Sequence, residues 1–188
     1  MVSLLPAIFS ATIMLTAPGA SAKTDPAPGG PTPNIPAPHY ALLVSPERRV
    51  RAADARVHSY LTEGLQRSST FARLLSALNT TDVIVYVERV MTLPRDTMGR
   101  LTMVPTKGNA RYLRIQIKSD LSMQEAIALI GHEMRHALEV AEDPSVRDSD
   151  ALIQLYERIG HSSGGEHVYD TTAAQDVGRQ IRRELLGA

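Results

Sequence analysis

The chain has 188 residues, in which 20 Lys and Arg balance 20 Asp and Glu, and it contains no Cys and no Trp. A chain of this length suits one ordinary domain. Zero net charge argues against a protein that neutralises nucleic-acid phosphates, since such proteins carry a basic surplus, and we expect no nucleic-acid partner. Without Cys, disulfide frameworks, Cys-ligated metals and thiol catalysis are excluded, which leaves His, Asp and Glu as the side chains suited to hold a transition metal.

The N-terminal segment predicts export. Residues 1–22 contain no charged side chain, residues 4–17 are mostly apolar, and Ala20-Ser21-Ala22 forms a small-x-small site that is followed by Lys23. This pattern is typical of a secretory signal peptide that is cleaved after Ala22. An uncleaved membrane anchor is the alternative, but the apolar run is shorter than the roughly 20 residues that cross a bilayer. We therefore predict a secreted or periplasmic protein that has no stable membrane insertion after cleavage.

The next segment predicts a linker. Residues 23–39 are rich in Pro and Gly, a composition that cannot pack a hydrophobic core and that favours an extended spacer. Residues 40–188 are numerous enough for one core, and they show no internal repeat at the spacing of solenoids or propellers. We predict a single domain over residues 40–188.

Two amphipathic helices are predicted at the start of this domain. Residues 53–66 and residues 69–79 each carry apolar side chains at the three- and four-residue spacing of one helical face. The side chains expected to face the core are Val57, Tyr60, Leu61 and Leu65 in the first helix, and Phe71, Leu74, Leu75 and Leu78 in the second.

Strand patterns follow the two helices. Residues 83–87 form a mostly β-branched run that is suited to burial on both faces of a sheet. Residues 112–118 alternate polar and apolar side chains, which predicts a half-exposed strand. A short strand at residues 101–104, joined to residues 111–118 through Lys107-Gly108-Asn109, predicts an antiparallel hairpin. The polar side of residues 112–118 either pairs with an extended peptide or marks an edge strand whose charges discourage aggregation.

The next predicted helix carries the most informative motif. Ser122 and Glu125 have the spacing of a capping box, so the helix begins there and extends to about residue 141. Within it, His132-Glu133-Met134-Arg135-His136 matches H-E-x-x-H, and residues four apart stack on one helical face. The two imidazoles can therefore bind one zinc ion while Glu133 takes a proton from a water molecule.

The alternative interpretation of this helix is that its histidines are ordinary hydrogen-bonded groups. Burying two imidazoles and a glutamate without partners would cost several kcal/mol in total, which favours a compensating charge or a metal. Gly131, just before the motif, either allows a close approach of the helix to the sheet or is a tolerated helix glycine.

Two further helices are predicted after this motif. Residues 150–159 place Leu152, Leu155, Tyr156 and Ile159 on one face, and the helix stops at Gly160. A loop covers residues 161–167. Residues 169–186 form the last helix, and the apolar stripe of this helix contains Ala173, Ala174, Val177, Ile181 and Leu185.

Asp170 lies on the apolar stripe of the last helix and is the preferred third metal ligand. Its alternative role is the N-cap of that helix, with Thr171 as the first helical residue. The rival ligands are Glu139, Glu142, Glu166, His161 and His167. Glu139 is disfavoured because a rigid helix would have to bend three consecutive turns of ligands around one ion. His167 and Tyr169 are candidates to stabilise the oxyanion that forms when water attacks a carbonyl, with solvated loop residues as the alternative.

The H-E-x-x-H motif resembles that of the zincin metallopeptidases, although Arg135 departs from the family's preference for uncharged residues between the histidines. The metzincin motif continues with Gly and a third His where this chain has Glu139 and Glu142. The resemblance is therefore to gluzincins or aspzincins, which take the third ligand from further along the chain. Residues 131–142 and 169–174 are also similar to a group of small exported bacterial proteins of uncertain function, in which a carboxylate occupies the position of Asp170.

This resemblance implies an α+β, zincin-like fold in which a small antiparallel or mixed sheet packs on helices and the H-E-x-x-H helix is central. It implies an exported metallopeptidase that binds Zn²⁺ through His132, His136 and Asp170 and that hydrolyses peptide or protein substrates through water activated by Glu133, with His167 and Tyr169 as assisting groups. The alternatives are a zinc amidase that acts on cell-wall peptides and a non-catalytic, zinc-stabilised binding domain.

Overall fold

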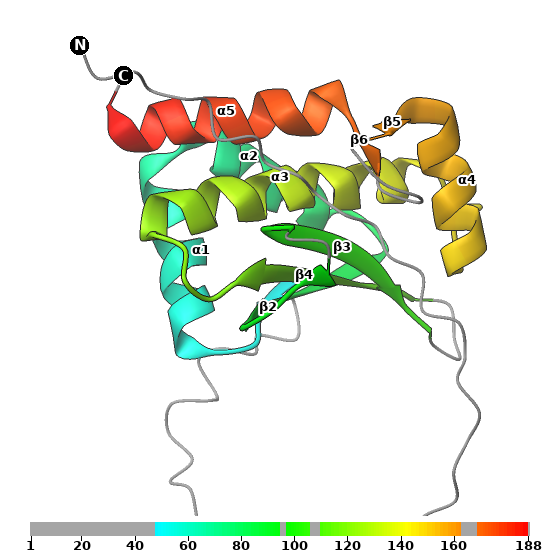
Figure 1. The fold of residues 1–188 in the computed structure, drawn as a ribbon, viewed down its shortest axis with the longest axis horizontal. Coiled ribbons are helices and arrows are strands. Elements are labelled where there is room, and N and C mark those ends of the chain that lie inside the picture. Colours follow the sequence, from blue (N-terminus) through cyan, green and yellow to red (C-terminus); the bar gives the residue numbers. More distant parts are fainter. Residues whose placement is uncertain (1–47, 95–96, 106–109, 163–168, 188) are drawn as a thin grey trace, which may run out of the picture.

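A computed structural model describes residues 48–94, 97–105, 110–162 and 169–187. The predicted signal peptide and linker lie outside the described residues. Within the described ranges the protein has an α+β fold with five helices and a mixed four-stranded sheet (Figure 1). The α+β class and the mixed sheet expected from the sequence are thereby confirmed.

The helices are close to their predicted ranges, except that the last one begins at Thr172, because residues 169 and 170 form a strand instead of its first turn. They are α1 (Ala55–Arg67), α2 (Ser69–Asn79), α3 (Met123–Glu142), α4 (Ser149–Ile159) and α5 (Thr172–Leu186). The strands of the main sheet are β1 (Val50–Ala52), β2 (Val83–Val90), β3 (Gly99–Val104) and β4 (Arg111–Lys118). A separate two-stranded sheet pairs β5 (His161–Ser162) with β6 (Tyr169–Asp170).

The strand order of the main sheet is β1-β2-β4-β3. β2 is parallel to both β1 and β4, whereas β3 and β4 form the predicted antiparallel hairpin, with Leu101 opposite Ile115. The predicted turn at residues 107–109 lies outside the described residues. Because β4 has a partner on each side, the expectation that it offers an edge to a peptide, or is a protected edge, is wrong. Among the described strands, β3 is the edge on that side of the sheet.

The two faces of this sheet differ in character. The odd-numbered side chains from Val83 to Val87 in β2 and from Leu113 to Ile117 in β4 are fully buried against the helices. On the other face, Arg100 donates to Gln116 and Gln116 donates to Glu88, three residues that lie directly opposite one another in the sheet. The prediction that residues 83–87 are buried on both faces is therefore correct except at Tyr86, which is 37% exposed on the polar face.

α3 is the central helix of the fold. It lies between the sheet and α5, and α1 and α2 cover the same face of the sheet (Figure 1). The predicted capping box is confirmed: Glu125 N–H donates to Ser122 Oγ, and Ser122 N–H donates to Glu125 Oε2. Most of the side chains on α3 are buried, because the helix has neighbours on opposite sides.

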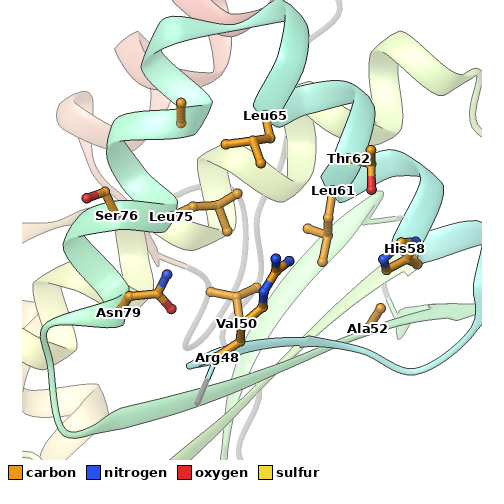
Figure 2. A pocket seen from close by; sticks show the side chains of 11 residues that line it. Arg48, Val50, Ala52, His58, Leu61, Thr62, Leu65, Leu75, Ser76 and Asn79 are labelled. Atoms are coloured by element: carbon orange, nitrogen blue, oxygen red, sulfur yellow. The ribbon is translucent and has the colours of Figure 1, made fainter. Parts of the chain in front are cut away.

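Two large side chains that were predicted to be inward are exposed, and so is Ala173 in the first turn of α5. Leu65 is 47% exposed and Ile159 is 45% exposed. Leu65 lines a surface pocket of about 280 Å³ between α1, α2 and β1 (Figure 2). Ile159 is the last residue of α4, where the helix ends at Gly160. Both lie in the last turn of a helix, where the neighbouring elements no longer cover them.

The C-terminal end of α3 is fixed to the sheet by a buried cation. Arg111, at the start of β4, is 3% exposed. Its Nη1 donates to the carbonyl oxygens of Val140 at 2.7 Å and Asp143 at 2.8 Å, and its Nη2 pairs with Asp82 at 2.6 Å. A positive charge at this end satisfies carbonyl groups that have no partner within the helix and complements the helix dipole.

In the part of the chain that the structure describes, no helix is both long and apolar enough to cross a bilayer.

Candidate metal centre

α3 places His132 and His136 on the face that turns toward α5. Their exposed fractions are 1% and 0%, and their ring centroids lie 4.9 Å apart in an edge-to-face arrangement. The predicted convergence of the two imidazoles is therefore confirmed. It follows from the spacing of four residues, which brings side chains from consecutive helical turns together.

Two glycines allow α5 to approach this face of α3 closely. A Cβ atom at Gly131 would lie 2.1 Å from Ile181 Cδ1, and one at Gly178 would lie 3.3 Å from His132 Cβ. Gly131 therefore permits a close approach to α5, which differs from both roles considered from the sequence, an approach to the sheet and a merely tolerated helix glycine. This close packing positions the residues that begin α5 beside the two histidines.

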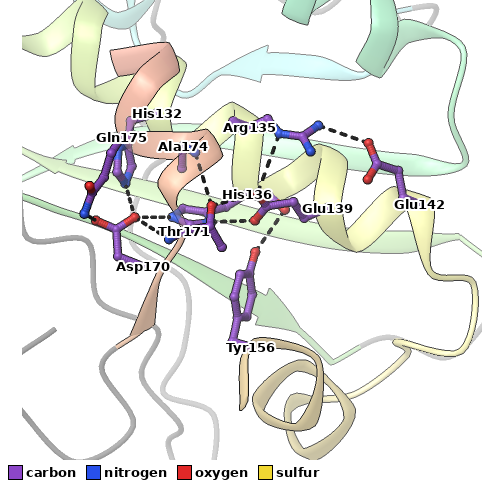
Figure 3. A network of polar contacts seen from close by, with 10 residues as sticks. All are labelled: His132, Arg135, His136, Glu139, Glu142, Tyr156, Asp170, Thr171, Ala174 and Gln175. Carbon is purple, nitrogen blue, oxygen red and sulfur yellow. Dashed lines mark hydrogen bonds and ion pairs between the residues drawn. The ribbon is translucent and has the colours of Figure 1, made fainter. Parts of the chain in front are cut away.

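Asp170 completes the group from β6, immediately before α5. Its side chain is fully buried, and its Oδ1 lies 3.4 Å from both His132 Nε2 and His136 Nε2 (Figure 3). One candidate ligand atom from each residue lies within 4.8 Å of the other two, so the three can hold a metal ion. The N-cap of α5 is Thr171, which accepts a hydrogen bond from Ala174 N–H at 3.1 Å. The interpretation of Asp170 as the N-cap is therefore wrong.

The polar atoms at this site are incompletely satisfied. Among the described residues, four buried side-chain atoms have no hydrogen-bond partner: His132 Nε2, His136 Nε2, and both carboxylate oxygens of Glu133. All four belong to the H-E-x-x-H motif. Leaving buried polar groups without partners costs about 1–3 kcal/mol each. Their concentration at one point indicates a site that binds a group from outside the chain.

Glu133 lies beside the start of β3. A Cβ atom at Gly99 would come within 2.9 Å of Glu133 Oε1, so the absence of a side chain at position 99 leaves room for the carboxylate. Burial raises the pKa of Glu133 to about 8. The physical reason is that a charged carboxylate loses its hydration in this environment.

The two histidines have different electrostatic environments. Burial and the neighbouring charge of His136 lower the pKa of His132, which favours a neutral imidazole. Burial also opposes protonation of His136, but its contacts with Asp170 and Glu139 outweigh this effect and raise its pKa to about 9. The same contact with His136 outweighs the burial of Asp170 and lowers its pKa. The site thus contains more buried carboxyl groups than histidines with a raised pKa, so the negative charge of its carboxylates is only partly balanced.

Glu139 contacts a histidine instead of joining the ligand group. Its Oε2 lies 2.8 Å from His136 Nδ1, its Oε1 accepts a hydrogen bond from Thr171 Oγ1 at 2.8 Å, and Arg135 Nε lies 3.6 Å from the same oxygen (Figure 3). Sequence reasoning considered Glu139 only as a ligand and missed this role. The signal was the spacing of three residues from His136, which also places side chains side by side on a helix.

The remaining predicted residues are distributed around the site. Tyr169 is half-buried, and its hydroxyl donates to Glu157 on α4 at 3.4 Å. Glu142 is exposed and forms an ion pair with Arg135 at 3.0 Å. His161 is exposed and lies 3.3 Å from Gln175 Nε2, which also donates to Asp170 Oδ2 at 2.9 Å. The structure does not bring Glu142 or His161 into the ligand group, and Glu166 and His167 lie outside the described residues.

Comparisons of the chain with protein-family models, with curated proteins and with solved structures find no match. Interpretation of the site therefore depends on its own chemistry. Two imidazoles and a carboxylate that converge beside a second, unpartnered carboxylate can hold a divalent cation and transfer a proton next to it.

Proposed function

We propose that the protein is an exported, zinc-dependent metallopeptidase of the zincin class. The observation that carries this proposal is the convergence of His132, His136 and Asp170 on one point beside the unpartnered carboxylate of Glu133. The signal-peptide pattern of residues 1–22 supports export. The central position of α3, between the sheet and α5, is compatible with a zincin-like architecture.

Two of the ligand–ligand distances are close to those of a tetrahedral zinc site, which supports zinc as the proposed metal. With zinc–nitrogen and zinc–oxygen distances of about 2.0–2.1 Å, the ligand atoms of a tetrahedral site lie about 3.3 Å from one another. Asp170 Oδ1 lies 3.4 Å from each of the two Nε2 atoms. Two His and one carboxylate are also a ligand set of catalytic zinc sites, which keep a fourth position for water or substrate.

Glu133 is the proposed general base. When bound, zinc supplies a Lewis acid that polarises the scissile carbonyl and lowers the pKa of a water molecule. In its ionised form, which a nearby divalent cation would favour, the carboxylate of Glu133 accepts the proton of the attacking water and then passes it to the leaving amine. Its two oxygens have no other hydrogen-bond partner among the described residues, so both are available for these transfers.

The edge of β3 is the proposed place for a peptide substrate. An extended peptide can add to the open edge of a sheet through main-chain hydrogen bonds. Among the described strands β3 is such an edge, and it begins at Gly99, next to Glu133. A peptide paired with β3 would pass close to the proposed base, which is the arrangement that hydrolysis of a peptide bond requires.

The second candidate is a non-catalytic domain in which zinc has a structural role. The burial of the three ligands favours this alternative, because none of them is more than 1% exposed. The unpartnered carboxylate of Glu133 opposes it, since a purely structural site has no use for a buried group of this kind.

Zinc content and peptide hydrolysis, measured on the purified protein and two variants, test the proposal. We expect one zinc per chain after metal-replete purification, cleavage of an unbiased peptide mixture, and loss of cleavage with retained zinc in Glu133→Gln. The matched control is Glu142→Gln, an exposed position on the same helix, which should keep both properties. A protein that binds no zinc overturns the proposal. Zinc binding with no cleavage of any peptide would favour the structural alternative.

A further inference from the structure

Glu139 and Thr171 connect two of the three candidate ligands through a continuous chain of contacts. Glu139 bridges His136 Nδ1 and the hydroxyl of Thr171, with both contacts at 2.8 Å. The backbone N–H of Thr171 donates to Asp170 Oδ1 at 2.7 Å, and this is the oxygen that faces the two histidines. Thr171 therefore contacts one ligand directly and reaches the other through Glu139.

The contact with Glu139 determines how His136 presents its ring. A neutral imidazole that donates from Nδ1 leaves Nε2 as the unprotonated, metal-facing atom, and a carboxylate at Nδ1 fixes both this tautomer and the ring orientation. Glu139 is 5% exposed and Thr171 is 4% exposed, so water has little access to compete for these contacts. The orientation of His136 thus depends on where Thr171 holds Glu139.

The hydroxyl of Thr171 performs two tasks at once. It accepts the hydrogen bond from Ala174 N–H that caps α5, and it donates to Glu139 on α3. A threonine hydroxyl has one proton to donate, and here the carboxylate of Glu139 receives it. Docking of α5 on α3 and alignment of His136 consequently share one group.

We propose that Thr171 is a positioning residue for the metal centre, which acts on His136 through Glu139 and on Asp170 through its own backbone N–H. The inference rests on the proposed function, because it takes His132, His136 and Asp170 to be metal ligands. Partners of this kind typically contribute 10- to 100-fold to metal affinity. The side chain of Thr171 therefore sets the affinity of the site although it touches no metal itself.

Binding of Zn²⁺ and Co²⁺ to the full chain, measured by competition with a chromophoric chelator, tests this role. Thr171→Val keeps the shape of the side chain and removes the hydroxyl. We expect it to raise the Kd for Zn²⁺ by about 10- to 100-fold. The visible absorption bands of the Co²⁺-loaded variant should also shift, because these bands report ligand geometry. Thr171→Ser keeps the hydroxyl and should restore both the Kd and the bands.

Asp148→Ala is the control for the loss of a helix cap. Asp148 caps α4 by accepting a hydrogen bond from Ala151 N–H at 2.8 Å. Its removal should lower the melting temperature to an extent similar to that of Thr171→Val and leave the Kd for Zn²⁺ unchanged. Glu139→Gln should weaken binding without removing any helix cap. Combining it with Thr171→Val should add little further loss, because both changes act through His136.

An unchanged Kd and unchanged Co²⁺ bands in Thr171→Val would overturn the inference. The same holds if Asp148→Ala loses as much affinity for Zn²⁺ as Thr171→Val, or if the losses in Glu139→Gln and Thr171→Val are strictly additive in the double variant. If Thr171→Val does not fold, the Kd for Zn²⁺ of Glu139→Gln, in which the carboxylate is changed, is compared with that of Thr171→Ser, in which the hydroxyl is kept. Failure of the unsubstituted protein to bind either metal would overturn the proposed function as well. Normal metal binding by Thr171→Val would overturn the positioning role alone.

Discussion

Gly131 shows how a single residue controls the distance between the two elements that carry the site. A side chain at position 131 points at Ile181, and a Cβ there would lie 2.1 Å from Ile181 Cδ1 but 3.5 Å from Cγ1 of the same residue. The conflict is thus confined to one methyl group at the end of a side chain. Removing that methyl should make room for a larger residue at position 131.

A compensating pair of substitutions tests this interpretation. Gly131→Ala alone should force the end of the buried Ile181 side chain out of its place between α5 and α3, which should lower stability and raise the Kd for Zn²⁺, because overpacking typically costs about 1–3 kcal/mol. Ile181→Val removes Cδ1, so the double variant should recover the Kd and also gain up to about 1 kcal/mol of helix propensity from alanine. Urea denaturation and metal titration of the four proteins give the coupling energy. Equal effects of Gly131→Ala in both backgrounds would contradict the proposed contact.

At the level of elements, α5 is attached to α2 by a carboxylate. Glu184, near the end of α5, accepts hydrogen bonds from Ser68 Oγ, Thr70 N–H and Thr70 Oγ1 at the N-terminus of α2. Burial alone would raise the pKa of Glu184, but these bonds and one from Gln180 lower it to about 2. The carboxylate also benefits from the positive end of the α2 dipole.

This contact predicts a specific acid dependence of stability. Because the folded state lowers the pKa of Glu184, its contribution is complete above the ordinary glutamate range, near pH 4.5, and is lost as the pH falls toward 2. Glu184→Gln should cost about 2 kcal/mol at pH 7 and progressively less at lower pH. Urea denaturation from pH 7 to pH 2 measures the difference, with Glu63→Gln, at an exposed ion pair on α1, as the control. A cost that does not change with pH would refute the assignment.

Local signals predicted the elements well, whereas long-range pairings escaped them. The capping box at Ser122 and the histidine spacing are local, and both were predicted correctly. The edge position of β3 was missed because β4 pairs in parallel with β2 as well as with β3. The residue pattern of a strand does not show which distant strand it will pair with. The bond between Glu139 and Thr171 spans 32 positions and was missed for the same reason. Asp170 was found as a ligand candidate because a carboxylate next to an apolar stripe is conspicuous, although the structure places it in β6 and not on the stripe of α5.

The whole molecule has no covalent cross-link, since the chain contains no Cys. Its stability depends on one hydrophobic core, formed by the helix-facing side of the sheet together with all five described helices. A metal held by residues of both α3 and β6 would join two parts of this core that are distant in sequence. Any ion that binds only the folded state adds to stability by mass action.

Zinc should therefore raise the melting temperature of the full chain. At a free concentration one thousand times the Kd, zinc adds about 4 kcal/mol, which corresponds to roughly 10 °C for a domain of this size. Chelation should reverse the change. In Asp170→Asn, which keeps the shape of the side chain and can still accept from Thr171 N–H, the shift should be much smaller. A zinc-dependent shift of the same size in Asp170→Asn would exclude Asp170 as a ligand.

The distribution of the ligands along the chain also has a kinetic consequence. His132 and His136 are made on one helix, but Asp170 and Thr171 follow only after α4 and the segment up to β6. Contacts between distant segments form late, because closing the intervening loop costs entropy. A newly made chain would thus present a pair of histidines long before it presents a complete site. High-affinity capture of the ion would be one of the last events in folding, and its rate would report when α5 docks.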